Sequence, residues 1–469
     1  MESVYAQNDK IKKRGEEMIE KLFKLKQNKT DVKTEVLAGV TTFMTMAYIL
    51  AVNPTMLSAS GMDATAVLMA TCLASFIGTA AMALMANYPF ALAPGMGLNA
   101  YFAYTVCGAM GYDWRVALLA VFAEGIIFII LSLTNVREAV FNAIPSALKK
   151  GVSAGIGLFI AFVGLQGAHI IVNSDSTLLT YVSFTENFHT EGICALLALI
   201  GLMITAVLYI RNVKGSILIG IVATWILGML CQAAGIYTVD EGYGFYSLYP
   251  TFALTDFSAL GQTFGQCFKA DFTGVSIPNF IVVLLSFLFV DMFDTIGTLV
   301  GVATKADMLD KNEKLPRIRQ ALLADAIATS AGAVLGTSTT TTFVESSAGV
   351  GAGARTGLAS MTTGILFLAA IFFAPIFTAI PGFATAPALI FVGFLMVSAI
   401  LKVNFDDASE AVPAYLCMLA MPLAYSISEG IAIGVISYVV IHVCTGKVKK
   451  ITPLMYVLAV LFVCKYIFL

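Results

Sequence analysis

The chain has 469 residues, of which 59% are hydrophobic and 12% are charged, and its formal net charge is -2. Soluble globular proteins carry about 25% charged residues, whereas apolar runs of about 20 residues recur here along nearly the whole chain. This composition excludes a soluble globular protein and predicts an all-α polytopic membrane protein embedded in the lipid bilayer. The eight cysteines are scattered without a CxxC pair, so we expect neither a disulfide framework nor a metal site. No motif indicates a nucleic-acid partner.

Residues 1–36 form a basic amphipathic lead that is too long and too polar for the apolar region of a signal peptide. After this lead the sequence predicts fourteen membrane segments, of which the third and the tenth are broken. Their expected bounds are 37–57, 64–86, 89–110, 116–133, 151–172, 191–210, 215–235, 279–301, 317–335, 337–353, 357–379, 384–401, 412–426 and 429–445. A last apolar stretch, 453–469, either crosses the membrane or lies at its surface.

The distribution of basic residues predicts the orientation of the chain. If the N-terminus is inside, nearly all of the 27 Lys and Arg residues fall in inner segments. The outer loops, which include 173–190 and 236–278, then carry mostly acidic and polar residues. Because cytoplasmic loops of membrane proteins are enriched in Lys and Arg, we expect a cytoplasmic N-terminus.

Short sequence matches recur in the same order in the two halves of the chain. Gly125-Ile-Ile-Phe128 returns as Gly364-Ile-Leu-Phe367, and Pro89-Phe90 aligns with Thr342-Phe343. Each half contains an odd number of predicted segments, seven, so the two halves have opposite orientations in the membrane. Inverted repeats with interrupted helices at equivalent positions are typical of secondary transporters, whose binding site lies near the bilayer midplane.

The tenth segment contains the least helical stretch of the chain, from Gly336 to Gly357. A run of Thr and Ser is followed by a Gly-rich half, and Glu345 lies where the two meet. Irregular backbone at membrane depth is tolerated only where it is packed in protein or lines a wet cavity, and an ionisable residue there is a candidate functional group. The pattern predicts a broken span that presents Glu345 to a substrate.

The third segment is the expected partner of this break, since two prolines and two glycines interrupt it between Pro89 and Gly97. Two such breaks at equivalent positions would meet at the repeat axis and expose backbone donors at the starts of half-helices. Asn99 in this segment is a candidate to hydrogen-bond a planar ligand. The alternative is a proline kink in which Asn99 bonds to a neighbouring helix.

Three further acids lie inside apolar segments. Asp291 and Asp294 are three residues apart in the eighth segment and so share a helix face, which suggests a polar cavity or a proton path. The alternative is that one of them only caps or pairs internally. Glu124 in the fourth segment is a candidate either for the proton path or for a hydrogen bond between helices.

The polar groups expected at the site are acids, amides and hydroxyls, and no Lys or Arg is expected at its core. This inventory favours an uncharged, planar, hydrogen-bonding ligand over an anion. A carboxylate accepts two N–H bonds from such a ring, and Phe343 or Phe90 would stack on its face. Burial favours the neutral form of a carboxyl group, which suits a group that exchanges a proton with the medium.

Four motifs together resemble the AzgA-like purine permeases of the xanthine/uracil permease superfamily, and the resemblance covers residues 30–469. The motifs are Glu35 to Pro54, Ala93 to Phe102, Phe289 to Thr298 and Gly336 to Gly357. The resemblance implies fourteen segments in two inverted halves, with a short strand before a half-helix in the third and tenth segments. It also implies proton-coupled import of adenine, guanine or hypoxanthine across the cell (inner) membrane, with no cofactor besides the coupling proton.

The resemblance further implies a division into two domains, through one of which, the gate domain, superfamily members often form homodimers. The expected parts are a core domain (37–134 and 279–380), a gate domain (135–235 and 381–446), an extracytoplasmic loop (236–278) and a hydrophobic tail (447–469).

The family's site residues correspond to Asp294, Glu345, Asn99 and Phe343 in this chain. Thr298 stands where uracil carriers have a His, so a His-based proton relay is not expected. We therefore expect substrate contacts from Glu345, Asp294, Asn99, Phe343, Phe90 and Thr298, and proton coupling through Glu345, Asp294, Asp291 and Glu124. The alternatives are an anion transporter of the same fold, a channel and an intramembrane enzyme. The enzyme is disfavoured because no nucleophile–base or metal constellation is present.

Overall fold

The computed structural model describes residues 17–134, 144–174, 176–240, 245–250, 254–305, 308 and 315–468. These residues are mostly helical, with two small two-stranded sheets. Within the described ranges, ten helices are long and apolar enough to cross a membrane. The expected all-α polytopic membrane architecture is thus confirmed, whereas the number of fourteen segments stays a prediction.

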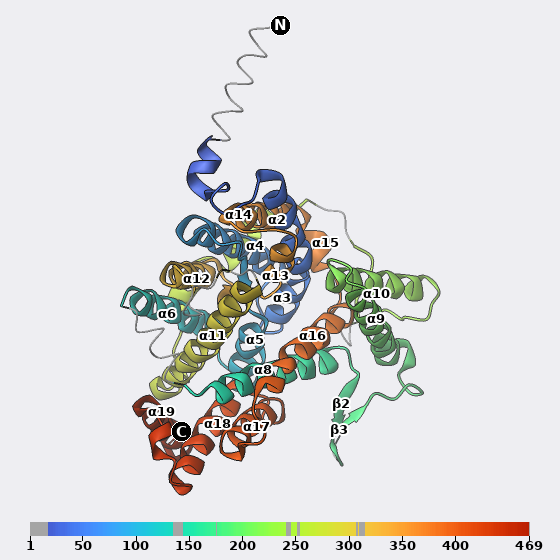
Figure 1. Ribbon diagram of the computed structural model, residues 1–469. Coiled ribbons are helices and arrows are strands. Elements are labelled where there is room, and N and C mark those ends of the chain that lie inside the picture. The colour runs from blue at the N-terminus through green and yellow to red at the C-terminus, as the bar shows by residue number, and fades with distance from the viewer. Residues whose placement is uncertain are drawn as a thin grey trace.

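The first half of the chain forms most of the blue-to-green elements in Figure 1. These are α2 (Val32–Met46), α3 (Ile49–Ser58), α4 (Ala64–Ala81), η1 (Met82–Ala86), β1 (Leu92–Pro94), α5 (Met96–Ala100), η2 (Tyr101–Ala109), α6 (Trp114–Leu133), α8 (Ser146–Gly167), β2 (Ile171–Ser174), β3 (Leu178–Tyr181), η3 (Phe188–Gly192), α9 (Ile193–Ile210) and α10 (Ser216–Ala233). Several helices begin at a side chain that accepts a backbone N–H of the first turn, as Asp31 does for Thr34 and Asp63 for Ala66.

The second half also consists mainly of helices and contains a short strand. It comprises η5 (Phe257–Gln262), η6 (Gln266–Lys269), α11 (Ile277–Lys305), α12 (Ile318–Leu335), β4 (Thr340–Thr342), α13 (Ser346–Gly351), α14 (Gly357–Ala370), η7 (Ile371–Phe373), α15 (Ala374–Thr378), α16 (Gly382–Val397), η8 (Ser398–Lys402), α17 (Ala408–Leu423), α18 (Ile427–Cys444), η9 (Val448–Lys450) and α19 (Pro453–Phe468). The predicted breaks in the third and tenth segments are confirmed, since each contains a short strand followed by a helix.

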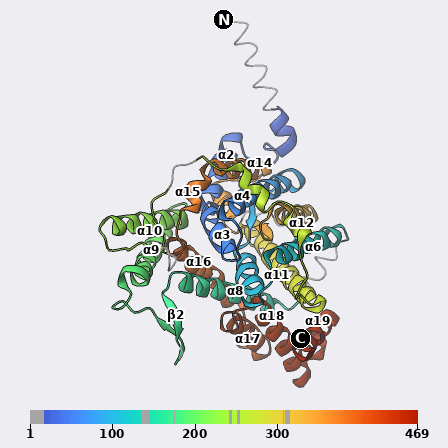
Figure 2. The same cartoon turned by 180° about the vertical axis from the view of Figure 1, so that it is seen from behind.

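The helices pack in two groups. Helices α2 to α6 pack with α11 to α14, and α8 to α10 pack with α16 to α18, while α19 packs on α18. In both views α17, α18 and α19 lie together at the C-terminal end of the molecule, and α9 and α10 project to one side (Figures 1 and 2). The expected bounds of the core and gate domains stay predictions.

Strands β1 and β4 join the two halves of the chain at the centre of the first group. They pair antiparallel, with Ala93 opposite Thr341 in the middle of the ladder. The Gly95 N–H donates to the carbonyl of Thr339, and the Phe343 N–H donates to the carbonyl of Ala91, each at 3.0 Å. These two bonds are equivalent by a two-fold rotation about the central pair, as inverted repeats require.

The strand register corrects one detail of the sequence repeat. Because the two-fold passes through the Ala93–Thr341 pair, Phe90 corresponds to Ser338 and not to Phe343. The alignment of Pro89-Phe90 with Thr342-Phe343 was therefore wrong. The shared Phe is a chance match, since backbone hydrogen bonds and not the aromatic side chains set the register.

Side-chain hydroxyls satisfy the outer edges of this small sheet. Thr79 on α4 accepts the Leu92 N–H at 2.9 Å and donates to the Leu92 carbonyl at 3.1 Å. Thr329 on α12 donates to the carbonyl of Thr340 at 3.1 Å. An exposed sheet edge is not tolerated in hydrocarbon, so these hydroxyls explain how two short strands persist inside a helical membrane protein.

Candidate functional site

Glu345 lies where β4 gives way to α13, at the N-cap position of that helix. Its side chain is half-buried, and Oε1 accepts a hydrogen bond from the Tyr48 hydroxyl at 2.7 Å. Tyr48 lies in the short turn between α2 and α3, and only 1% of its surface is exposed. The first span thus contributes a fixed donor that orients the carboxyl group of the tenth.

Asp294 on α11 approaches the other broken span. A Cβ atom built on Gly95 would lie 3.6 Å from Asp294 Oδ2, so the carboxyl group lies close to the backbone at the N-cap of α5. The N-terminal end of a helix favours negative charge. The two predicted site acids therefore lie near the two breaks, Asp294 beside Gly95 and Glu345 at the start of α13.

Asp291 and Asp294 lie one helical turn apart, but their surroundings differ. Asp294 is half-buried, whereas Asp291 is 0% exposed. Asp291 accepts a hydrogen bond from the Thr295 hydroxyl at 2.8 Å, and this hydroxyl also lies 3.0 Å from Asp325 Oδ1 on α12 and 2.6 Å from Thr341 Oγ1 on β4. A buried polar cluster thus joins α11, α12 and β4 directly behind the site.

The carboxyl group of Glu124 on α6 is hydrogen-bonded to Thr339, the residue that precedes β4. Its Oε2 atom accepts a hydrogen bond from the Thr339 hydroxyl at 2.8 Å, and both residues are 0% exposed. This contact links α6 to the segment before β4 and not to a neighbouring helix. A part for Glu124 in proton transfer stays a prediction.

Asn99 on α5 is also 0% exposed, and its Oδ1 atom accepts a short hydrogen bond from the Ser338 hydroxyl. The Nδ2 group has no hydrogen-bond partner among the described residues. A buried amide N–H without a partner is costly. The oxygen of Asn99 therefore bonds within the protein, to the segment before β4, and a ligand contact from its nitrogen stays a prediction.

The three remaining residues that were predicted to contact the substrate differ in exposure and packing. Phe343 directly follows β4 and is 6% exposed, and Thr298 is half-buried on α11, one turn beyond Asp294. Phe90, in contrast, is 0% exposed and stacks on Tyr88, with ring centroids 5.1 Å apart. Because its ring already packs within the protein, we propose no substrate contact for Phe90.

The sequence analysis missed Tyr48 and Asp325. Both occur in segments that were assigned by hydropathy alone, Tyr48 in an apolar run and Asp325 within Leu-Ala-Asp-Ala. A signal was available for each. A buried Tyr needs a hydrogen-bond partner for its hydroxyl, and Asp325 is an intramembrane acid, as Glu124 is.

Comparison with known proteins places this chain among membrane permeases. A family model described as a permease family matches residues 33–433. The guanine/hypoxanthine permease PbuO of Bacillus subtilis is 46% identical over 94% of this chain and 98% of its own length. The adenine permease AdeP of Escherichia coli is 40% identical over 97% of each chain.

A solved structure shares the fold at low sequence identity. The transmembrane domain of the cyanobacterial bicarbonate transporter BicA superposes with a TM-score of 0.62 and 15% identity, over 86% of this chain and 97% of that domain. This likeness supports the inverted-repeat transporter fold and says nothing about the transported molecule.

Proposed function

Since this chain belongs to that permease family, within the xanthine/uracil permease superfamily, we propose that it imports a purine nucleobase by proton symport. Relatives at 40–46% identity are named as adenine and guanine/hypoxanthine permeases, and they align over nearly their whole length. The proposed substrates are adenine, guanine and hypoxanthine. In this proposal the protein is a transporter and not an enzyme, and it uses the proton as coupling ion without another cofactor.

The observation that carries the proposal is the placement of Glu345 and Asp294 at the two breaks beside the paired strands. Each carboxyl group accepts N–H donors of a purine when ionised and donates one bond when protonated. The Nδ2 group of Asn99 supplies a further donor, and Phe343 supplies an aromatic face. Two carboxyl groups oppose an anion, so the site chemistry disfavours the alternative of an anion transporter.

The proposed transport cycle moves the core domain against the gate domain around this site, which would alternate its access to the two sides. Proton binding, at Glu345 by preference, would neutralise a half-buried charge before the loaded core domain moves. We propose a cytoplasmic N-terminus, a cell (inner) membrane location, and a homodimer formed through the gate domain.

The test is uptake of radiolabelled hypoxanthine in cells that express Glu345→Gln. Gln keeps the shape and still accepts the Tyr48 hydroxyl, but it takes up no proton, so we expect uptake to fall at least tenfold. Glu186→Gln, which changes an exposed outer-loop acid, is the matched control. Wild-type uptake with unchanged sensitivity to a protonophore in Glu345→Gln would remove Glu345 from the mechanism, and competition by sulfate and not by purines would favour the anion transporter.

A further inference from the structure

We propose that Asp325 is a second proton-carrying group of the transporter and that it shares one proton with Asp291 through the hydroxyl of Thr295. This inference rests on the proposed proton symport and assigns part of the coupling to a residue outside the substrate contacts. Thr295 Oγ1 lies 2.8 Å from Asp291 Oδ1 and 3.0 Å from Asp325 Oδ1. All three residues are 0% exposed.

The two contacts of the Thr295 hydroxyl point to a proton on this pair. A hydroxyl group has one hydrogen to donate and accepts two hydrogen bonds, whereas two carboxyl oxygens lie at hydrogen-bond distance from Thr295 Oγ1. In our proposal Thr295 donates to one carboxyl group, and the other carboxyl group is protonated and donates to Thr295. Asp291 and Asp325 make further interactions, which the proposal leaves in place.

The third contact of Thr295 completes this arrangement. The hydroxyl of Thr341 lies 2.6 Å from Thr295 Oγ1 and donates to its second lone pair. With one carboxyl group protonated and the other ionised, each contact among the two carboxyl groups and the two hydroxyls has one donor and one acceptor. If both acids were ionised, two buried charges would face one hydroxyl across distances of 2.8 and 3.0 Å, which low dielectric makes unfavourable. The proton therefore belongs to the pair and not to either residue alone.

The elements packed against α12 carry acids, cysteines and three basic residues. These elements are α4, η1, α6, η6, α11, β1 and β4. Their titratable and charged residues are Cys72 on α4, Arg115 and Glu124 on α6, Cys267 and Lys269 on η6, and Asp291, Asp294 and Lys305 on α11. Arg115 lies in the first turn of α6, where it pairs with Asp113, and Lys269 is exposed. The acid Glu124 is 0% exposed and its carboxyl group is hydrogen-bonded to Thr339.

This pair is coupled to the substrate site through Thr341. Thr341 is the central residue of β4, the strand that pairs with β1 and leads to Glu345. Its methyl group would lie 2.7 Å from a Cβ atom on Gly95, and the same Cβ atom would lie 3.6 Å from Asp294 Oδ2. Loss of the shared proton leaves two carboxylates that repel each other across Thr295. This repulsion would move α11 away from α12 and so shift β4, because both helices pack on that strand. Proton release would thus change the positions of both site acids.

The test compares two transport modes of purified Asp325→Asn in proteoliposomes. The Asn amide donates permanently to Thr295 and so imitates the protonated acid, but it releases no proton. We expect hypoxanthine accumulation driven by an imposed pH gradient to fall at least tenfold more than hypoxanthine exchange without a gradient. Wild-type accumulation and wild-type pH dependence in this variant would overturn the inference.

Substitutions of Thr295 provide a second test if Asp325→Asn does not fold. Thr295→Ser retains the bridging hydroxyl and should preserve gradient-driven accumulation, whereas the isosteric Thr295→Val removes the hydroxyl and should abolish it. Equal accumulation by the Ser and Val variants would overturn the shared proton. Wild-type protein that neither exchanges nor accumulates hypoxanthine would instead refute the proposed function itself.

Discussion

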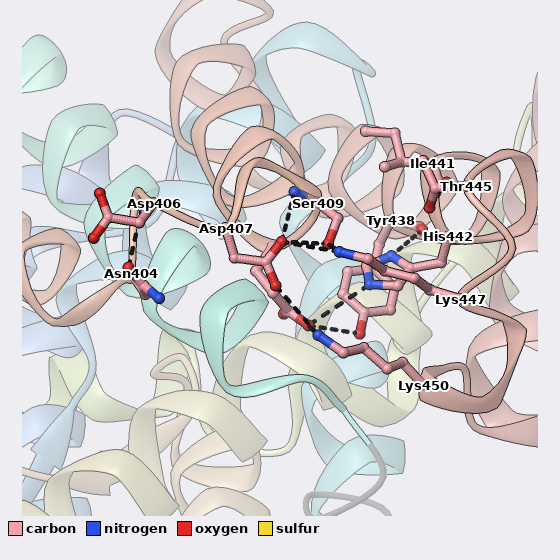
Figure 3. A network of polar contacts seen from close by, with 11 residues as sticks. Asn404, Asp406, Asp407, Ser409, Tyr438, Ile441, His442, Thr445, Lys447 and Lys450 are labelled. Carbon is pink, nitrogen blue, oxygen red and sulfur yellow. Dashed lines mark hydrogen bonds and ion pairs between the residues drawn. The ribbon is translucent and has the colours of Figure 1, made fainter.

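Two groups of acidic residues lie in the two packed groups of helices, and they differ in the chemistry of their partners. Around β4, Thr and Tyr hydroxyl groups lie at hydrogen-bond distance from the carboxyl groups of Glu124, Asp291, Asp325 and Glu345. At the start of α17, by contrast, lysines surround the acids. Figure 3 shows Lys447 and Lys450 converging on Asp407, at 3.2 and 3.3 Å.

The hydrogen-bond and ion-pair partners of each group of acids determine which protonation states these acids adopt. The Ser409 hydroxyl, followed by the Lys447 ammonium, holds the pKa of Asp407 well below its usual range, so this acid stays ionised at neutral pH. Lys450 also reaches Glu410 Oε1 at 3.3 Å. A hydroxyl partner, unlike an ammonium group, accepts as readily as it donates, so it accommodates both states of an acid. The acids around β4 are therefore suited to exchange protons, whereas Asp407 and Glu410 are suited to hold α17 and η9 together.

The largest effect is expected when a hydroxyl group is removed from the partners of the acids around β4. Thr339→Val leaves Glu124 Oε2 without its donor, and both residues are 0% exposed. A buried polar group left without its hydrogen-bond partner costs about 1–3 kcal/mol. We expect a lower melting temperature of purified protein and severalfold slower hypoxanthine uptake, because a displaced residue 339 would also shift its backbone carbonyl, which accepts the Gly95 N–H at the N-cap of α5. Thr339→Ser should restore both, and a Val variant as stable as wild type would show that this bond is dispensable.

A smaller effect is expected where a hydroxyl orients an acid that remains half-buried. Tyr48→Phe removes the donor at 2.7 Å from Glu345 Oε1 without changing the packed ring. A neutral hydrogen bond contributes about 0.5–1.5 kcal/mol, so we expect the KM for hypoxanthine to rise roughly two- to tenfold. Tyr181→Phe, which changes an exposed tyrosine of strand β3, is the control. An unchanged KM would mean that Tyr48 does not position Glu345 for the substrate.

Much of the fold was predictable because it follows from local composition. Long apolar runs predicted the spanning helices, and the Thr/Ser run and the Pro-Gly stretch predicted the two breaks, each of which contains a strand. The family motifs selected Asp294 and Glu345, and both lie at those breaks. Local sequence was sufficient here because Pro, Gly and β-branched residues disfavour a regular helix wherever they occur.

Hydrogen bonds between residues that are far apart in the sequence were not predictable in this way. Glu35 lies in the first turn of α2, but its carboxyl group accepts backbone N–H groups of Arg355 and Ala359 at the start of α14. Likewise Asp325 meets Asp291 only because α11 and α12 both pack on β4. A hydropathy pattern identifies a buried acid but does not indicate which hydroxyl faces it, since this depends on helix rotation about the strand pair.

The smallest effect, and the sharpest contrast with the acids around β4, is expected for Asp407→Asn. Asn still accepts the Ser409 N–H, so the variant removes only the charge that faces Lys447 and Lys450. Because the folded-state pKa of Asp407 is lowered, its charge stabilises the fold above its unfolded pKa of about 4, and this contribution is lost as the pH falls further. We expect a slightly lower melting temperature at pH 7, a difference that shrinks in strong acid and in high salt, and unchanged hypoxanthine uptake. Asp406→Asn, whose side chain points away from the lysines in Figure 3, should change neither quantity. A loss of uptake in Asp407→Asn as large as that of Glu345→Gln would remove the distinction, since an acid paired with lysines would then also act in transport.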